Sequence, residues 1–186
     1  VVPDSPSGVV GSTKPTSGIT TTSSITKPSN YCTWSPIDRA QASSPDTIGT
    51  LSNGNLKATS SSGWTQTRGT FYLTSGKWYY EYTIDSTGSF PSIIGYVGAD
   101  YSGGSGTRRA YKVDTNIFTY DVSGTENTES YGSGGATNGD VIGVMLDLDN
   151  GTIGFSKNGT DIGTARSVML TNLPSGGWTP YVGLNG

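Results

Sequence analysis

The sequence of 186 residues contains no histidine and only one cysteine, Cys32. The lack of histidine excludes Ser-His-Asp and Cys-His catalysis, as well as every histidine-ligated metal site. A single cysteine excludes a disulfide within the chain, and with it the small disulfide-stabilised scaffolds common among secreted proteins. Cys32 is therefore predicted to be a small buried apolar residue, and the sequence indicates no metal or cofactor site.

Charge is also scarce, since Asp, Glu, Lys and Arg make up 13% of the chain and leave a net charge of −3. Phosphate recognition requires a basic surface, whereas Arg108 and Arg109 are the only adjacent basic residues in the sequence. No segment is long and apolar enough to span a membrane. We therefore expect neither a nucleic-acid partner nor insertion into a membrane.

The residues that are abundant point to a β-protein. Glycine occurs 28 times and hydrophobic residues make up 32% of the chain, which is typical either of a disordered segment or of a β-fold with many tight turns. The 11 Tyr, 4 Trp and 4 Phe favour the folded alternative, because disordered chains are poor in aromatic residues. A chain of this length is sufficient for one β-sandwich with a real core.

The first 29 residues differ from the rest of the chain. Val1–Pro28 is rich in Ser, Thr, Gly and Pro and contains no aromatic residue, so it buries too little apolar surface to offset the entropy of ordering. Residues 1–29 are therefore predicted to be a linker or arm. Two interpretations stay open, a flexible tether and an extended arm that lies on a partner subunit. Residues 30–186 are predicted to form one folded domain.

Alternating apolar and polar residues predict strands, because successive side chains of a strand point to opposite faces. Lys77–Ile84 is the clearest strand, and others are predicted at residues 93–99, 117–122, 141–148, 152–156 and 179–184. Asn-Gly pairs at Asn53 and Asn158 predict tight hairpin turns. Since no segment has a helical period, the many short strands predict an all-β sandwich or barrel.

The two most apolar of these strands indicate which side chains form the core. One face of the strand at residues 141–148 and of the strand at residues 152–156 carries only apolar side chains, namely Ile142, Val144, Leu146, Leu148, Ile153 and Phe155. These side chains are predicted to point inward, with a turn at Asp149-Asn150-Gly151 between the two strands. Strand, turn, strand and turn in succession predict a β-meander.

Several segments resemble the SPRY family. The stretch from Gly139, GDVIGVMLDLDNGTIGFSKNG, resembles the most recognisable part of the family: a Gly-Asp entry, an apolar strand ending in Leu-Asp, a turn, and a strand ending in Asn-Gly. GKWYYEYTI from Gly76 resembles the family's first signature strand, with Tyr80 where the family usually has Trp. IIGYVGA from Ile93 and TPYVGL from Thr179 resemble later strands, in the family's order.

The resemblance implies a bent antiparallel β-sandwich of the concanavalin A-like type, with ligands bound by loops at one end. It also implies a recognition module rather than an enzyme. Because the family normally continues with a further strand, the domain at 30–186 is expected to be truncated at its C-terminus. YCTWSPID from Tyr31 and LSNGNL from Leu51 resemble SPRY-type segments of bacteriophage structural and tail-fibre proteins, which implies a location on the surface of a virion.

Candidate ligand-binding residues cluster between Asp100 and Tyr111, in a segment expected to be a loop between strands. The candidates in this loop are Tyr101, Arg108, Arg109 and Tyr111. Exposed Tyr and Arg are typical of recognition surfaces, and Tyr rings stack on sugars. The alternative is an ordinary loop whose tyrosines pack at its base. Tyr131 and Trp64 are secondary candidates, whereas Trp78 and Trp178 are expected in the core.

Asp147 and Asp149 are spaced as two carboxylates on one face of a strand, which is the arrangement that a glycosidase would need. However, they flank a tight turn, where Asp side chains bond the nearby backbone, so the turn interpretation is favoured. The same run resembles part of a calcium loop, but no distal Glu follows and Asp161 is the next acid. We therefore expect no enzymatic activity.

Four functional hypotheses follow from these features. The first is a non-enzymatic phage virion structural protein, a capsid decoration, fibre or tail component, whose partners are other virion proteins in a homo-oligomeric or symmetric assembly. The second is an adsorption module that binds a host surface glycan or protein through residues 101–111. The third is a cellular SPRY adaptor that binds a peptide. A glycosidase comes fourth.

Overall fold

The computed structural model describes residues 31–37, 49–61, 63–85, 92–101, 106–122, 125–167 and 174–186. The chain divides into two compact units, Val1–Thr33 and Trp34–Gly186. The predicted linker at residues 1–29 lies outside the described residues. Within the first unit, Cys32 is half-buried rather than fully buried as predicted.

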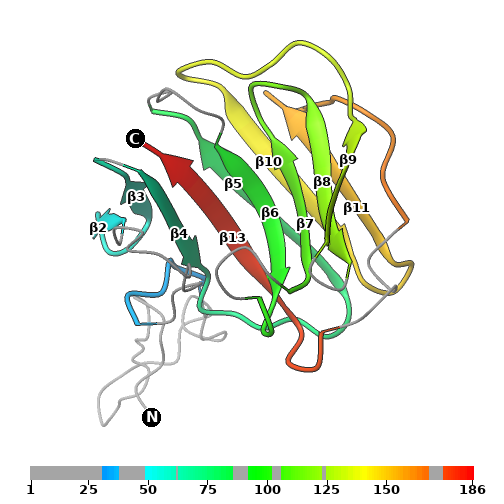
Figure 1. The fold of residues 1–186 in the computed structure, drawn as a ribbon, viewed down its shortest axis with the longest axis horizontal. Helices are drawn as coiled ribbons and strands as arrows, with labels where there is room; N and C mark the ends of the chain where they lie inside the picture. Colours follow the sequence, from blue (N-terminus) through cyan, green and yellow to red (C-terminus); the bar gives the residue numbers. More distant parts are fainter. Residues whose placement is uncertain are drawn as a thin grey trace, which may run out of the picture. The chain divides into compact units, whose positions relative to one another are not determined.

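The second unit is built from two antiparallel sheets and contains no helix among its described residues, which confirms the all-β sandwich (Figure 1). The six-stranded sheet has the order β4 (Trp64–Arg68), β13 (Trp178–Asn185), β6 (Ile93–Gly98), β7 (Arg108–Lys112), β8 (Ile117–Val122), β9 (Thr125–Ser130). The four-stranded sheet has the order β12 (Thr160–Asp161), β11 (Thr152–Lys157), β10 (Val141–Asp147), β5 (Lys77–Thr83). A short hairpin of β2 (Thr50–Ser52) and β3 (Lys57–Thr59) completes the described fold. Within the described ranges, no helix is long and apolar enough to cross a membrane.

The strands predicted from alternation are confirmed as β5, β6, β8, β10, β11 and β13, each within one residue at either end. Three longer strands were missed, namely β4, β7 and β9. Their sequences, WTQTR, RRAYK and TENTES, lack an alternating apolar face, so a search for alternation cannot find them. Strands β4 and β9 are the outermost strands of the six-stranded sheet, where polar side chains are common.

The core lies between the inner faces of the two sheets. The six predicted core side chains, from Ile142 to Phe155, are at most 5% exposed and belong to one cluster with Ile94, Phe118 and Val182 of the opposite sheet. Burial of each such side chain is worth about 1.5–3 kcal/mol relative to exposure. The prediction of inward-facing residues in β10 and β11 is therefore confirmed.

The two Asn-Gly turns have the backbone geometry that their sequence predicts. Asn53 and Gly54 have φ angles of 53° and 64°, and Asn158 and Gly159 have angles of 50° and 80°. Positive φ at both central residues defines the hairpin turn that matches the twist of the strands, and Asn and Gly tolerate this conformation best. Asn158 and Gly159 are the only residues between the paired Lys157 and Thr160, whereas four residues, Asn53–Leu56, connect the paired Ser52 and Lys57.

Candidate functional site

The residues predicted to bind a ligand are mostly buried. Tyr101, Arg108, Arg109, Tyr111 and Tyr131 are at most 5% exposed, and Trp64 is half-buried. Three of them lie in strand β7 rather than in a loop. The expectation that this set presents exposed Tyr and Arg faces is therefore wrong for these side chains, whereas ligand binding near them stays a prediction.

Arg108 is held in a network of buried polar groups. Its Nη1 donates to the Tyr101 hydroxyl at 2.9 Å, and its Nη2 donates to Glu126 at 2.8 Å and to Asp121 at 3.4 Å. Lys112 donates to the other Glu126 oxygen at 2.7 Å. Burial raises the pKa of Asp121, and the Arg108 charge only partly opposes that effect. These contacts pair the Arg108 charge inside the protein, so it is not presented to a ligand.

Arg109 points to the other face of β7 and is packed between aromatic rings. Its guanidinium lies 5.6 Å from the centre of the Trp178 ring and 5.8 Å from that of Tyr120. Its Nη1 donates to the carbonyl oxygens of Arg108 and Asp121, both at 2.7 Å. Burial lowers the pKa of Arg109. The Arg109 side chain is therefore packed inside the sandwich and holds it together.

Tyr111 and Tyr131 also belong to the core. Each ring centre lies 5.4 Å from that of Phe155, and the Tyr111 hydroxyl donates to Asn116 at 2.8 Å. Trp64 packs against a second apolar cluster, which contains Ile93, Val97, Tyr101, Ala110 and Tyr181. The predicted aromatic residues are thus structural elements of the sandwich.

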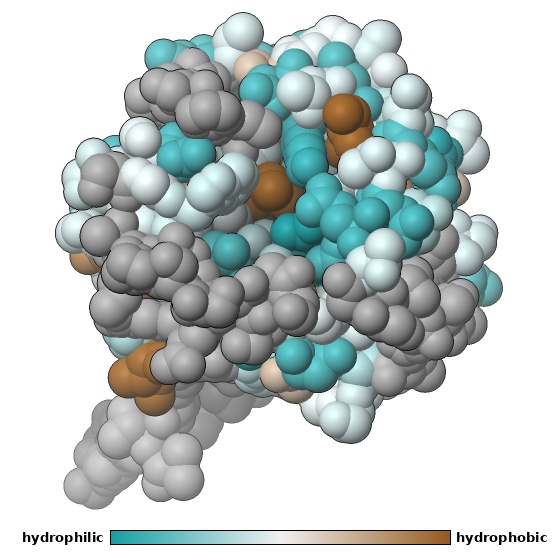
Figure 2. Space-filling model, viewed as in Figure 1, coloured by the Kyte–Doolittle hydropathy of each residue, from teal (hydrophilic) through white to brown (hydrophobic). Residues whose placement is uncertain are grey.

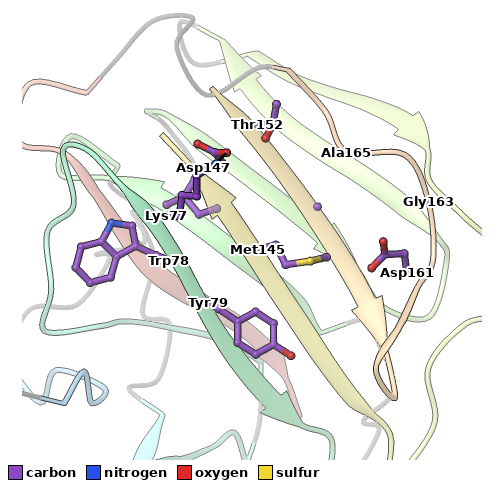
Figure 3. Close-up of a pocket in the computed structure, with 11 residues that line it drawn as sticks. Lys77, Trp78, Tyr79, Met145, Asp147, Thr152, Asp161, Gly163 and Ala165 are labelled. Atoms are coloured by element: carbon purple, nitrogen blue, oxygen red, sulfur yellow. Dashed lines mark hydrogen bonds and ion pairs between the residues drawn. The ribbon is translucent and has the colours of Figure 1, made fainter. Parts of the chain in front are cut away.

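A groove of about 420 Å³ crosses the outer face of the four-stranded sheet (Figure 3). Its lining includes Lys77 and Tyr79 from β5, Met145 and Asp147 from β10, Thr152 and Gly154 from β11, and Asp161, Gly163 and Ala165 after β11. Strand register explains this set, because Tyr79 pairs with Met145 and Met145 pairs with Gly154. Directly paired residues of antiparallel strands point to the same face of a sheet.

One wall of the groove is the ring of Tyr79, which is 55% exposed. Its hydroxyl donates to the Glu81 carboxylate at 2.8 Å, and this bond raises the pKa of Tyr79. A Cβ atom on Gly143 would lie 2.6 Å from the Tyr79 hydroxyl. The absence of a side chain at Gly143 therefore makes room for the tyrosine to lie across the sheet.

The floor of the groove contains Gly154 between Met145 and Ala165. A Cβ atom on Gly154 would meet the Met145 Cε at 3.4 Å and the Ala165 Cβ at 3.5 Å. A side chain at this position would therefore point into the groove rather than into the core. Gly154 itself is buried beneath these two side chains, so Met145 and Ala165 form the apolar surface that a ligand would meet.

One end of the groove is closed by an ion pair between Lys77 and Asp147. Asp147 also accepts hydrogen bonds from the Asn150 backbone N–H at 3.0 Å and side-chain amide at 2.8 Å. Asp149 accepts a hydrogen bond from the Gly76 N–H at 2.8 Å. The prediction that these aspartates bond the turn is therefore confirmed for Asp147, whereas Asp149 bonds the backbone of a segment distant in sequence.

We expect the Asp147 carboxyl to stay ionised in acid, because hydrogen bonds from Lys77 and Asn150 lower its pKa from 3.8 to about 2. Since the folded-state pKa is the lower one, these bonds stabilise the fold above about pH 3.8. That contribution is lost as the pH falls from 3.8 to about 2. An NMR titration of the carboxyl carbon shift measures the midpoint, and Asp147→Asn identifies the signal. A midpoint near 3.8 would contradict the expectation.

Asp161 lies on the other side of the groove from Tyr79 (Figure 3). Its side chain is exposed, and no residue in the described part of the chain bonds or ion-pairs with its carboxylate. Among the described residues, no three His, Cys, Asp or Glu side chains are close enough together to hold a metal ion. The groove therefore offers an aromatic wall, an apolar floor and one available carboxylate.

Trp78 at the margin of the groove is another correction, since it was expected in the core but is 40% exposed. Its ring packs edge-on against Phe71, and its Nε1 donates to the Ser75 carbonyl oxygen at 2.7 Å. One sequence signal could have found this site. The alternation in Lys77–Thr83 places Tyr79 on the polar face of its strand, where a large aromatic residue is unusual.

Comparisons with known proteins support the fold of this region. The SPRY domain family model matches residues 77–186. The crystal structure of the SPRY domain of human HERC1 is similar, with a TM-score of 0.51 and 19% sequence identity. The likeness covers 67% of this chain and 76% of that chain. At this identity the structural likeness shows the fold alone, whereas the family match spans all four strands that form the groove.

Proposed function

Because this chain belongs to the SPRY family, we propose that it is a protein-recognition module that holds a segment of its partner in the groove across β5, β10 and β11. SPRY domains are generally protein-interaction modules rather than enzymes. The fold alone does not name the binding surface, so the surface is inferred from its side chains.

One observation carries the proposal: the exposed ring of Tyr79 forms one wall of the groove. Tyr79 is one of the six large hydrophobic residues that are exposed in the described part of the chain, and its ring lies in the groove. Trp78 pairs with the core residue Leu146, so its ring lies on the opposite face of β5. Met145 adds a flexible apolar side chain. Tyr, Trp and Met are enriched at protein interfaces. By contrast, the described residues visible in Figure 2 are mostly hydrophilic, with hydrophobic residues in separate spots.

The shape of the groove suits part of an extended protein segment. Its volume of about 420 Å³ is that of a few side chains. The floor is made by paired strands, so it is formed before the partner arrives and costs little ordering on binding. The wall and floor together therefore favour a partner that inserts one or two side chains across the sheet.

We expect Gly154→Leu to abolish partner binding and to leave the fold intact, because the new side chain would fill the groove from its floor. The probe is a library of short random peptides selected on the wild-type chain, and fluorescence anisotropy compares the selected peptides on the variant. Thr128→Leu is the matched control, since it adds the same side chain to an exposed position of β9. Equal binding to both variants, or no selected peptide at all, would sink the proposal.

The biological setting of this recognition is a separate proposal that comes from the sequence. YCTWSPID and LSNGNL support a place on a phage particle beside other virion proteins, with a host glycan or protein as the alternative partner. Labelling of purified particles with an antibody against the domain tests this setting, and unlabelled particles would count against it.

A further inference from the structure

We infer that the groove receives a basic segment of the partner, with an Arg or Lys side chain that crosses Gly154 and pairs with Asp161. This inference rests on the proposed function, because it names the occupant of the same groove. Three observations support it: the excess of negative charge around the groove, the exposed carboxylate of Asp161 at one side, and the apolar surface between Tyr79 and Ala165.

The charge around the groove is strongly unbalanced among the described residues. The groove and its margins hold four carboxylates, those of Glu81, Asp147, Asp149 and Asp161, and one cation, Lys77. Lys77 is paired with Asp147, and Asp149 adds to its negative surroundings. A surface of this kind attracts a cationic partner and repels an acidic one.

Cations on the neighbouring segments do not compensate this charge. The Lys157 ammonium donates to the carbonyl oxygens of Gly134 and Gly135, on the far side of β11 from the groove. The Arg166 guanidinium pairs with Glu129 at 3.1 Å and lies 5.0 Å from the centre of the Tyr131 ring. Both are occupied elsewhere, so Asp161 keeps its charge available for a partner.

The floor and wall match the stem of a long basic side chain. Lys and Arg bury their methylene stems along apolar surface and keep the charged head in polar surroundings. Across Gly154 such a stem would touch Met145 and Ala165, and its head would reach the side of the groove where Asp161 lies (Figure 3). The half-exposed ring of Tyr79 on the opposite wall adds a site for attraction to a cation.

A neutral glycan uses these features less well. Each sugar hydroxyl both donates and accepts hydrogen bonds, so a sugar site needs protein donors as well as acceptors. In this groove the cation Lys77 is already paired with Asp147, and the remaining charged groups are carboxylates, which only accept. Binding of a neutral sugar would also depend little on salt, because it involves no ion pair. Salt dependence and loss on charge removal therefore distinguish the two kinds of partner.

The test uses the full 186-residue chain, labelled with ¹⁵N, and a short Gly-Ser peptide that carries spaced arginines. A matched peptide replaces each arginine with citrulline, which keeps the shape and removes the charge. We expect the arginine peptide to shift the amide signals of Met145, Gly154 and Ala165. The citrulline peptide, added salt and Asp161→Asn should each weaken binding, the variant by about fivefold. Asp114→Asn removes the same charge at an exposed turn and should change nothing.

The possible failures are distinguishable. Equal binding of the arginine and citrulline peptides, lost in Gly154→Leu, would overturn the basic occupant and keep the groove as the binding site. Neutral oligosaccharides that bind and are blocked by Gly154→Leu would replace the peptide with a glycan. Peptide binding that persists in Gly154→Leu would overturn both the occupant and the proposed function.

Discussion

Replacing Arg108 with methionine is expected to lower the free energy of unfolding by about 3–5 kcal/mol. The Arg108 side chain is 6% exposed and the Asp121 side chain 1% exposed. Without the guanidinium, Asp121 would be a buried carboxylate that lacks its ion-pair partner and keeps only the weaker influence of Arg109 and Lys112, and its Oδ2 already lacks a hydrogen bond. Tyr101 would lose the donor to its hydroxyl as well. Urea denaturation of the wild type and the variant measures the loss.

Two further variants isolate the buried charge as the cause. Lys112→Met removes a cation from the more exposed end of the same network, where the pair with Glu126 is worth less than about 1 kcal/mol. In the double variant Arg108→Met with Asp121→Asn, both buried charges are absent, so part of the lost stability should return. A loss in Arg108→Met no larger than that in Lys112→Met would show that the buried pair has little effect.

Gly95→Ala is the second change with a large expected effect, a loss of about 3 kcal/mol. A Cβ atom at this position would lie 2.2 Å from the Arg109 carbonyl oxygen and 2.6 Å from the Ala110 Cα. Both atoms are backbone of the neighbouring strand β7, which cannot move aside alone because it is paired with β8 as well. Thermal unfolding followed by circular dichroism measures the effect.

The same substitution is expected to disturb the groove. The Tyr80 hydroxyl of β5 donates to the Gly95 carbonyl oxygen at 2.8 Å and ties the four-stranded sheet to β6. A shift of the backbone at Gly95 would therefore move the strand that carries Tyr79. Gly154→Ala is the matched control, since the three atoms nearest to its added methyl would all lie at ordinary contact distances of 3.4–3.9 Å. Similar losses in the two variants would mean that the close approach at Gly95 is relieved at little cost.

The sequence alone predicts the fold class because the relevant signals are local. Alternation in Val141–Asp147 and Thr152–Lys157 places Ile142, Val144 and Phe155 on one face, and Asn-Gly pairs dictate hairpin turns through their tolerance of positive φ. The motif order from Gly76 to Leu184 leads to the SPRY family, which the family match confirms.

The sequence could not predict that the Tyr and Arg residues of the expected loop are buried. Adjacent arginines in a strand point to opposite faces, and each finds its partners far along the chain, Arg108 at Asp121 and Glu126, Arg109 at Trp178. No local pattern indicates such partners, so the sequence leaves open whether these side chains are exposed for recognition or packed at the base of the loop.

For the groove, alternation in the sequence is enough to predict that Tyr79 and Met145 each lie on the outward face of a strand. The hairpin of β10 and β11 is local, but the pairing of β5 with β10 joins segments more than 50 residues apart, so the meeting of Tyr79 and Met145 follows only from the fold. β12 and the segment after it then place Asp161 and Ala165 beside them. Alternation specifies which side chains share a face, whereas the packing of layers decides which face is covered and which stays open to a partner.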